Sequence, residues 1–297
     1  MAAMDWIARV LGLGIALEGA LAACALAQTP AQTPSTAAAA QADEARARFD
    51  RLCAASGPEA REPVTAFVLQ AEVLTRSGVQ TNEARIEYRY LAPDCIRFML
   101  PSRSETGRFG LAQEQYWLKS GKDVVVLAGR EYKEDRQQVD EMAALARNYL
   151  ALSDPRRVNL VSLELLAVPP RDLPEELART GKKLVWLALE SPDFALVRRE
   201  GTPPPPGTLY RVELGLGEDD LPRMAIVRAR AGVNDAPLLV VLDSYRAASG
   251  FRVPYHLAVH VLEAGRKPAV FAPRASQDIT VTQADLRPAL RVDDFRP

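Results

Sequence analysis

Few residues in this 297-residue chain are suited to acid–base or metal chemistry. The two histidines, His256 and His260, would have to supply any histidine-based zinc site or catalytic triad. In a strand they would share one face with Ala258, while Glu263 would lie on the other face. That face lacks a third ligand, so we expect no metal site.

Motifs for nucleophilic or phosphate chemistry are incomplete. No Gly-x-Ser-x-Gly occurs, and Ser249-Gly250 lacks the first glycine of that motif. The segments 119–122 and 180–183 lack the upstream glycine of a phosphate-binding loop, so they are predicted to be turns. The acid pairs Asp219-Asp220 and Asp293-Asp294 fall in predicted loops, where we expect them to be solvated. We therefore predict a protein that is not an enzyme and uses no cofactor, with an exported hydrolase as the least favoured alternative.

Composition and charge exclude other classes. Hydrophobic residues make up 48% and charged residues 25%, as in ordinary globular proteins. Because 37 Lys and Arg are balanced by 38 Asp and Glu, the chain lacks the basic character of a nucleic-acid-binding protein. At about 150 residues per domain, the length fits two domains or one large β-rich domain.

The N-terminal residues 1–27 have the order of a secretory signal. Arg9 offsets Asp5, an apolar run covers 10–17, and Ala25-Leu26-Ala27 precedes Gln28. Because Glu18 interrupts the run before it reaches the roughly 20 residues of a membrane span, we predict a cleaved signal and export.

Two processing routes remain open. Leu21-Ala22-Ala23-Cys24 resembles the lipobox of bacterial lipoproteins, in which the cysteine is lipidated; alternatively, cleavage follows Ala27. Residues 28–42 are predicted to form a flexible linker with a reach of roughly 20 Å, suited to a membrane tether. Cys53 and Cys95 could form a disulfide in an oxidising compartment or be separate small apolar residues.

The mature chain, residues 43–297, is predicted to be one β-rich domain. An amphipathic helix is expected over 43–55, followed by three alternating strands at 66–76, 86–90 and 96–100, and by further strands at 113–119, 124–127 and 131–132. Helical spacing then predicts helices at 135–152, from 155 to about 169, and at 172–181. Later strands are predicted at 183–190, 208–214, 224–230, 238–243, 255–263 and 279–282. This order indicates an α+β fold, a strongly curved antiparallel sheet (an incomplete β-barrel) with helices covering its concave face.

Several segments resemble the LolA/LolB-like family of outer-membrane lipoprotein carriers. The hairpin at 85–98 has the family's strand, Pro-x, strand order with an arginine, Arg97, in the second strand. The Gly-containing hairpin at 116–127, followed by Tyr132-Lys133 and a helix, and the closing segment 279–290 with Phe295, are similar to the family as well. The stretch 155–206 is longer than in the small carriers.

The resemblance implies an apolar cavity for acyl chains, closed by helices. On the predicted strands, one face would line it with Phe67, Leu69, Val73, Ile86, Tyr88, Tyr90, Ile96, Phe98 and Leu100. Arg97 would contact the lid helices by donating hydrogen bonds to their carbonyls, although its alternation also suits a solvated arginine. The expected ligands are lipid or lipoprotein acyl chains, and the expected location is the periplasm or a membrane facing it, with Cys24 as the lipidation site. The alternative is an envelope sensor or protein-interaction module whose core is filled.

Overall fold

The computed structural model describes most of the chain after residue 35. The described residues are 36–57, 64–77, 80–92, 95–101, 106–112, 115–120, 123–127, 144, 146–196, 207–229, 237–263, 265 and 268–295. The predicted signal (1–27), Cys24 and the start of the linker lie outside them.

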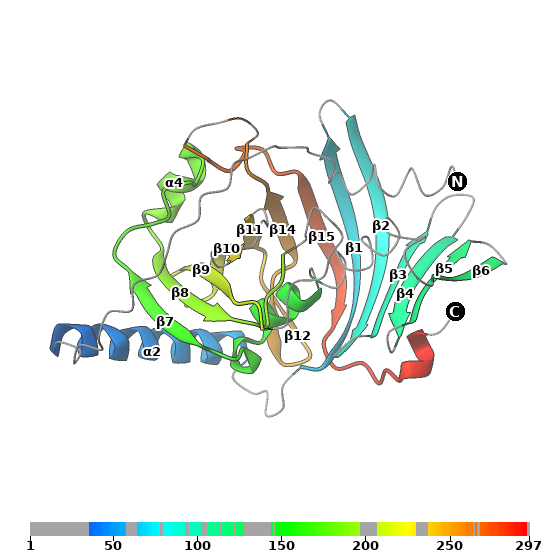
Figure 1. The fold of residues 1–297 in the computed structure, drawn as a ribbon, viewed down its shortest axis with the longest axis horizontal. Helices are drawn as coiled ribbons and strands as arrows, with labels where there is room; N and C mark the ends of the chain where they lie inside the picture. Colours follow the sequence, from blue (N-terminus) through cyan, green and yellow to red (C-terminus); the bar gives the residue numbers. More distant parts are fainter. Residues whose placement is uncertain are drawn as a thin grey trace.

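A 13-stranded antiparallel sheet organises the molecule (Figure 1). From one edge to the other the order is β6 (Asp123–Leu127), β5 (Gln115–Ser120), β4 (Thr106–Ala112), β3 (Cys95–Pro101), β2 (Gln80–Leu91), β1 (Ala66–Ser77), β15 (Gln277–Asp285), β14 (His256–His260), β11 (Leu238–Asp243), β10 (Pro222–Ala229), β9 (Tyr210–Leu216), β8 (Val185–Ser191) and β7 (Ser162–Leu166). Two short strands, β12 (Arg246–Ala248) and β13 (Phe251–Val253), form a separate hairpin. The predicted α+β fold with a curved antiparallel sheet is confirmed, and the described strands do not close into a ring.

The inner side of the curve is covered by helices. Figure 1 shows the green helical segment 146–153 inside the arc from β7 to β15, with α2 (Thr36–Ser56) beside it. On α2, the buried side chains of Ala45, Phe49 and Leu52 recur at helical spacing, as predicted. The helix begins at Thr36, earlier than expected, because its alanines have high helix propensity even where they pack on nothing. Residues 36–42 are therefore helical rather than part of the predicted linker.

A second apolar layer lies on the outer side of β8 to β11. There α4 (Glu175–Gly181), predicted as the short helix at 172–181, packs with Trp186, whose Nε1 donates to Gly181 O at 2.8 Å. Arg228 donates to Asp172 and Glu213 in the same layer. Burial by itself would lower the pKa of Arg228, but the hydrogen bond to Asp172 and the charge of Glu213 outweigh it and raise the pKa.

The helix predicted from 155 to 169 is wrong. A 3-10 turn, η2 (Pro155–Arg157), is followed by strand β7, which pairs with β8. Leu163 is half-buried while its neighbour Glu164 is exposed, so the segment follows the period of a strand. A short apolar run fits both periods, and here sheet pairing decides between them.

Sequence patterns also missed strands β4, β12 and β13. Gly107 and Gly110 interrupt the apolar alternation of β4, and the other two strands have only three residues each. Within the part of the chain that the structure describes, no helix has both the length and the apolar character needed to cross a membrane.

Candidate functional site

One face of strands β1, β2 and β3 carries the predicted apolar residues in register. Phe67 lies opposite Tyr90, which lies opposite Ile96. Leu69 lies opposite Tyr88, which lies opposite Phe98. Because directly opposed residues of antiparallel strands point to the same face, these six side chains form two adjacent rows.

The backbone register carries both rows to the sheet edge. The first continues through Leu111, Tyr116 and Leu127, and the second through Phe109, Leu118 and Val125. Each row therefore crosses six strands, β1 to β6, with an aliphatic or aromatic residue at every position. We call these positions the two apolar rows.

On the opposite face of β1 to β3, charged and polar residues prevail, while Leu91 and Cys95 belong to a small separate cluster. There Gln70 lies opposite Glu87, and Arg89 lies opposite Arg97. Ion pairs on this face join Arg85 to Glu72 and Arg89 to Glu87. The contrast between the faces marks the rows as the side of the sheet that avoids water.

Aromatic rings dominate the described part of the rows. The Phe67 ring lies 5.5 Å from the Tyr88 ring and 5.4 Å from the Tyr90 ring, both stacked. Tyr88 meets Phe98 edge-on at 5.9 Å. Such arrangements add stabilisation beyond the burial of area. Burial, together with the neighbouring Tyr90, raises the pKa of Tyr88 well above its ordinary value, so its hydroxyl stays protonated.

The structure brings most of the predicted lining residues together. Phe67, Leu69, Tyr88, Tyr90, Ile96 and Phe98 belong to one buried cluster, with Ile86 half-buried against it. Val73 is buried farther along β1, opposite Ala84. Leu100 occupies a described position of β3, but its side chain lies outside the described residues.

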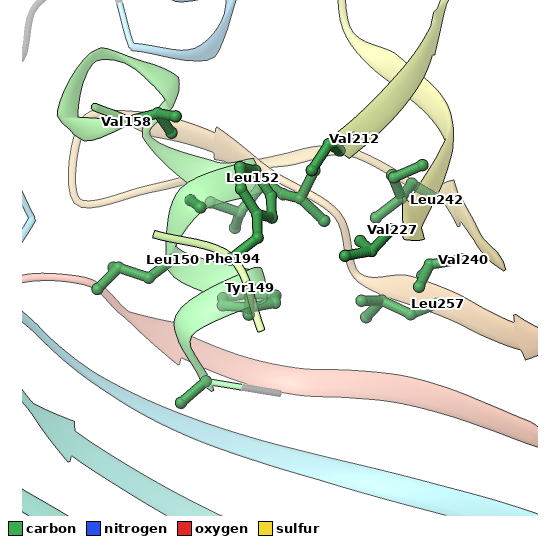
Figure 2. Close-up of a cluster of buried hydrophobic side chains, with 14 of the residues drawn as sticks. Tyr149, Leu150, Leu152, Val158, Phe194, Val212, Val227, Val240, Leu242 and Leu257 are labelled. Carbon is green, nitrogen blue, oxygen red and sulfur yellow. The ribbon is translucent and has the colours of Figure 1, made fainter. Parts of the chain in front are cut away.

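The helical segment 146–153, which we call the inner helix, packs against the β1 end of the apolar rows. The Tyr149 ring meets the Phe67 ring at 5.6 Å. Figure 2 shows Tyr149 and Leu152 on the side of the helix that faces the other labelled side chains of the core, whereas Leu150 points away from them. These core side chains include Phe194, Val212, Val227, Val240, Leu242 and Leu257. The β1 end of the rows is thus continuous with a filled core.

Two buried polar contacts fix the inner helix, and no pattern of neighbouring residues indicates the partners of either. Asn148 donates to Ala195 O at 2.8 Å and accepts from Ala195 N at 2.9 Å. Asp154 accepts from Val64 N at 3.1 Å and from Arg156 Nε at 2.9 Å. Since Val64 leads into β1, Asp154 ties the end of the inner helix to the start of the rows.

Arg97 lies on the polar face and contacts the C-terminal segment. Its Nη1 donates to Asp294 O at 2.8 Å, in the 3-10 turn η3 (Val292–Phe295). The partner is thus a carbonyl, of the kind the resemblance implied, but it belongs to η3. Phe295 is fully buried beside Cys95 in a small cluster of its own.

Both cysteines of the described chain are free thiols. Cys53 lies on α2 against the main core, whereas Cys95 lies with Phe295. Burial, reinforced by the nearby Asp50 carboxylate, raises the pKa of Cys53 to about 11. Of the alternatives left open, the structure has the separate apolar thiols.

Both histidines lie on β14, which β15 separates from β1. His260 is buried with Nδ1 2.9 Å from Ala272 O, and His256 Nε2 lies 3.6 Å from an Asp278 oxygen. Among the described residues, no group of three or more His, Cys, Asp or Glu side chains could hold a metal ion.

The prediction that Asp219 and Asp220 are simply solvated is wrong. Arg48 Nη1 lies 2.5 Å from Asp220 Oδ1, and Arg223 contacts both oxygens of Asp219 at 2.9 Å. These partners are distant in sequence or come from the next strand, so no local pattern shows them. The pair anchors α2 to the turn between β9 and β10.

Comparisons with known proteins give distant structural similarity only. No family model matches the sequence, and no curated protein matches it. A LolA superfamily protein of Nitrosomonas europaea is similar with 12% identity and a TM-score of 0.45, covering 85% of this chain and 97% of that one. A DUF1329 family protein of Desulfovibrio piger gives 11% identity and a TM-score of 0.44, with the same coverage.

A third similar structure is a putative outer membrane lipoprotein-sorting protein domain of Vibrio parahaemolyticus. It shares 10% identity with a TM-score of 0.41, and the match covers 86% of this chain and 97% of that chain. The names of these proteins include the family that the sequence resembles. All three TM-scores lie below 0.5.

Proposed function

We propose that this protein is an exported, non-enzymatic binder of lipid or lipoprotein acyl chains in the bacterial envelope. The observation that supports the proposal is the pair of apolar rows crossing β1 to β6. Strands lie about 4.8 Å apart, so six strands span about 24 Å, a length comparable to an extended long acyl chain. Burial of each methylene contributes about 0.8 kcal/mol, so a chain laid along a row would bind well without any charged contact.

Binding must replace contacts that the protein makes with itself. Phe67, Tyr90 and Ile96 are almost completely covered in the unliganded protein. The proposed ligand would therefore lie toward β3 to β6, and side chains that cover the rows would move to admit it. Tyr149, which covers Phe67, is the described contact at the boundary of the filled core.

The binding test is displacement of a fluorescent fatty acid. We expect saturable binding of the probe, competed by phospholipid or lipopeptide, and loss of binding in Phe98→Glu because a charge is placed in the second row. The matched control is Val68→Glu, which places the same charge on the opposite face of β1, where Val68 lies opposite Arg89. Thermal unfolding of both variants checks that the fold persists. Absence of saturable binding by the wild-type protein would remove the proposal.

A second candidate is an envelope sensor or protein-interaction module. The near-complete burial of Phe67, Tyr90, Ile96 and Phe98 favours it, because a filled core needs no ligand. Native mass spectrometry of protein purified from its own envelope separates the two functions. Co-purifying lipid favours the carrier or acceptor, whereas a lipid-free mass together with a stable protein partner favours the module.

The location and anchor are part of the same proposal. We place the protein in the periplasm or tethered to a membrane facing it, with Cys24 as the lipidated residue. Labelled fatty acid should be incorporated into the wild-type protein but not into Cys24→Ser. A lipid-free mature chain beginning at Gln28 would instead indicate a diffusible periplasmic protein.

A further inference from the structure

Arginines gather around the acid pair at the turn between β9 and β10. Asp220 contacts Arg48 at 2.5 Å and Arg51 at 3.4 Å, both from α2. Asp219 contacts Arg223 at 2.9 Å and Arg252 of β13 at 3.7 Å. Each carboxylate is therefore shared by two guanidinium groups, and four positive charges face two negative ones.

The arginine side chains are more exposed to solvent than the carboxylates with which they pair. The side chains of Asp220 and Asp219 are 18% and 32% exposed, whereas those of Arg51 and Arg252 are 49% and 46% exposed. The charge presented to solvent at this turn is therefore mainly that of guanidinium groups.

The register of the β12–β13 hairpin separates Arg252 from two nearby arginines that lie over aromatic rings. Arg252 lies opposite Ala247 on one face, whereas Arg246 shares the other face with Phe251 and Val253. Arg246 lies over the Tyr255 ring at 4.7 Å, and Arg287 over the Phe251 ring at 5.5 Å. A ring orients a guanidinium without neutralising its charge. Figure 1 shows β12 near one end of α2, which agrees with the close approach of Gly57 to the Phe251 ring. We call the four arginines that share Asp219 and Asp220 the arginine surface: Arg48, Arg51, Arg223 and Arg252.

Carboxylates at the rim limit the excess charge. Asp243 accepts from Ser244 N at 2.6 Å and Asp285 from Arg287 N at 2.9 Å, and Glu218 is exposed next to Asp219. The attraction to an anionic partner is therefore moderate. It would act best where another feature already brings the partner close.

We propose that the arginine surface docks the protein on a membrane leaflet rich in anionic phospholipid. Guanidinium groups match phosphate in geometry and charge, and basic residues near an anionic leaflet each strengthen binding. The surface includes α2, the first described helix, and the predicted lipidation site Cys24 lies 12 residues before Thr36. The linker that the sequence predicts after Cys24, with its predicted reach of roughly 20 Å, would keep the surface within range of a tethering membrane. The proposal does not depend on acyl-chain binding by the apolar rows.

The test uses the full chain expressed with its own leader and carrying Cys24→Ser, so that no acyl chain contributes. Sedimentation is measured with phosphatidylcholine vesicles and with vesicles that also contain phosphatidylglycerol. We expect about tenfold stronger binding to the anionic vesicles, lost at high salt because the interaction is electrostatic.

Matched variants separate the surface from total charge. Arg51→Ala with Arg252→Ala should reduce binding to anionic vesicles about tenfold. Arg85→Ala with Arg179→Ala removes the same charge from two exposed arginines, each paired with one glutamate elsewhere, and should leave binding unchanged. Asp219→Asn removes the negative charge that pairs with Arg223 and Arg252, so it should strengthen binding to the anionic vesicles.

Three results would overturn the docking proposal. They are equal binding to the two kinds of vesicle, equal losses in the two double variants, and selective capture of an acidic protein without vesicle binding. Fatty-acid probe binding by the Arg51→Ala, Arg252→Ala variant should match the wild-type value, so failure of the docking proposal is distinct from failure of the proposed function.

Discussion

The two halves of the sheet differ in how many of their faces are buried. In β10, Met224, Ala225, Ile226 and Val227 are consecutive and all buried, because apolar layers cover both faces. In β2 the residues alternate, with Arg85 exposed, Ile86 half-buried and Tyr88 buried. A strand covered on both sides is continuously apolar, whereas a strand covered on one side alternates.

Because of this difference, we expect the two halves to differ in how readily they admit a ligand. In one half, strands β8 to β11 form a layered core in which a ligand would have to displace packed side chains on either face. In the other half, from β1 to β6, the described core contacts lie mainly on the face of the apolar rows, and among the described residues the opposite face of β1 to β3 is covered only by the small cluster of Leu91, Cys95 and Phe295. A ligand could replace covering contacts there without breaking the layered core, so the two halves should respond differently to the same substitution.

The largest expected effect comes from truncating a phenylalanine in each half. Phe194 and Phe98 are both 2% exposed. Phe194→Ala should lower the free energy of unfolding by about 3–5 kcal/mol, because the layered core cannot collapse around the cavity. Phe98→Ala should cost less and should weaken fatty-acid probe binding. Urea unfolding and probe titration measure both quantities.

An equal loss of stability in the two variants, with probe binding unchanged in Phe98→Ala, would show that Phe98 is ordinary core. The two halves would then differ only in the polarity of the face that lies away from the main core. This result would favour the interaction-module function.

The second largest loss of stability is expected at the contact between the two halves, which we call the seam. Asp154 is fully buried and joins Val64, before β1, to the end of the inner helix. Asp154→Ala leaves Val64 N and Arg156 without their partner and should cost about 2–4 kcal/mol. Asp154→Asn keeps an acceptor oxygen and should cost less. If both variants unfold at the wild-type urea concentration, the seam does not hold the halves together.

The sequence predicted what is periodic and local. Alternation at Phe67, Tyr88 and Phe98 placed these residues on one face of their strands, because side-chain direction in a strand is fixed by its period. Alternation could not show that the rows cross six strands. That result depends on the register of β4, a strand that the sequence pattern missed. The single apolar run of β7 fitted a helix equally well until its pairing with β8 was known.

Contacts between distant residues were beyond reach for a different reason. Val64 and Asp154 are 90 residues apart, and Arg48 and Asp220 are 172 residues apart. An aspartate in a loop is usually solvated, so nothing in the local sequence shows that Asp154 is buried or that Asp220 is largely covered by arginines. The fold has to be known before such partners can be named.

A smaller effect should follow from releasing α2. Asp220 has φ of 57°, a region that asparagine tolerates, so Asp220→Asn removes charge without adding backbone strain. Losing the partly buried contacts with Arg48 and Arg51 should cost about 1–2 kcal/mol in urea unfolding. Asp50→Asn is the control: its pair with Arg46 is well exposed, at 64% and 59%, and should contribute at most about 0.5 kcal/mol. Similar losses of unfolding free energy in the two variants would show that the Asp220 contacts do not specifically hold α2 in place.

The smallest change concerns the chemistry of Cys53, which reports whether α2 stays docked on the layered half. Its pKa is raised from 9.0 to about 11, chiefly by burial, so at pH 8 the thiolate fraction falls about a hundredfold. A raised folded pKa contributes stability below pH 9 that is lost as the pH rises through about 11. In a Cys24→Ser, Cys95→Ala background, a disulfide reagent should react with Cys53 about a hundred times more slowly in the native than in the unfolded protein. Adding Asp220→Asn should accelerate the native reaction, since release of α2 exposes the thiol. A native rate equal to the unfolded rate would mean that α2 does not remain packed against the core in solution.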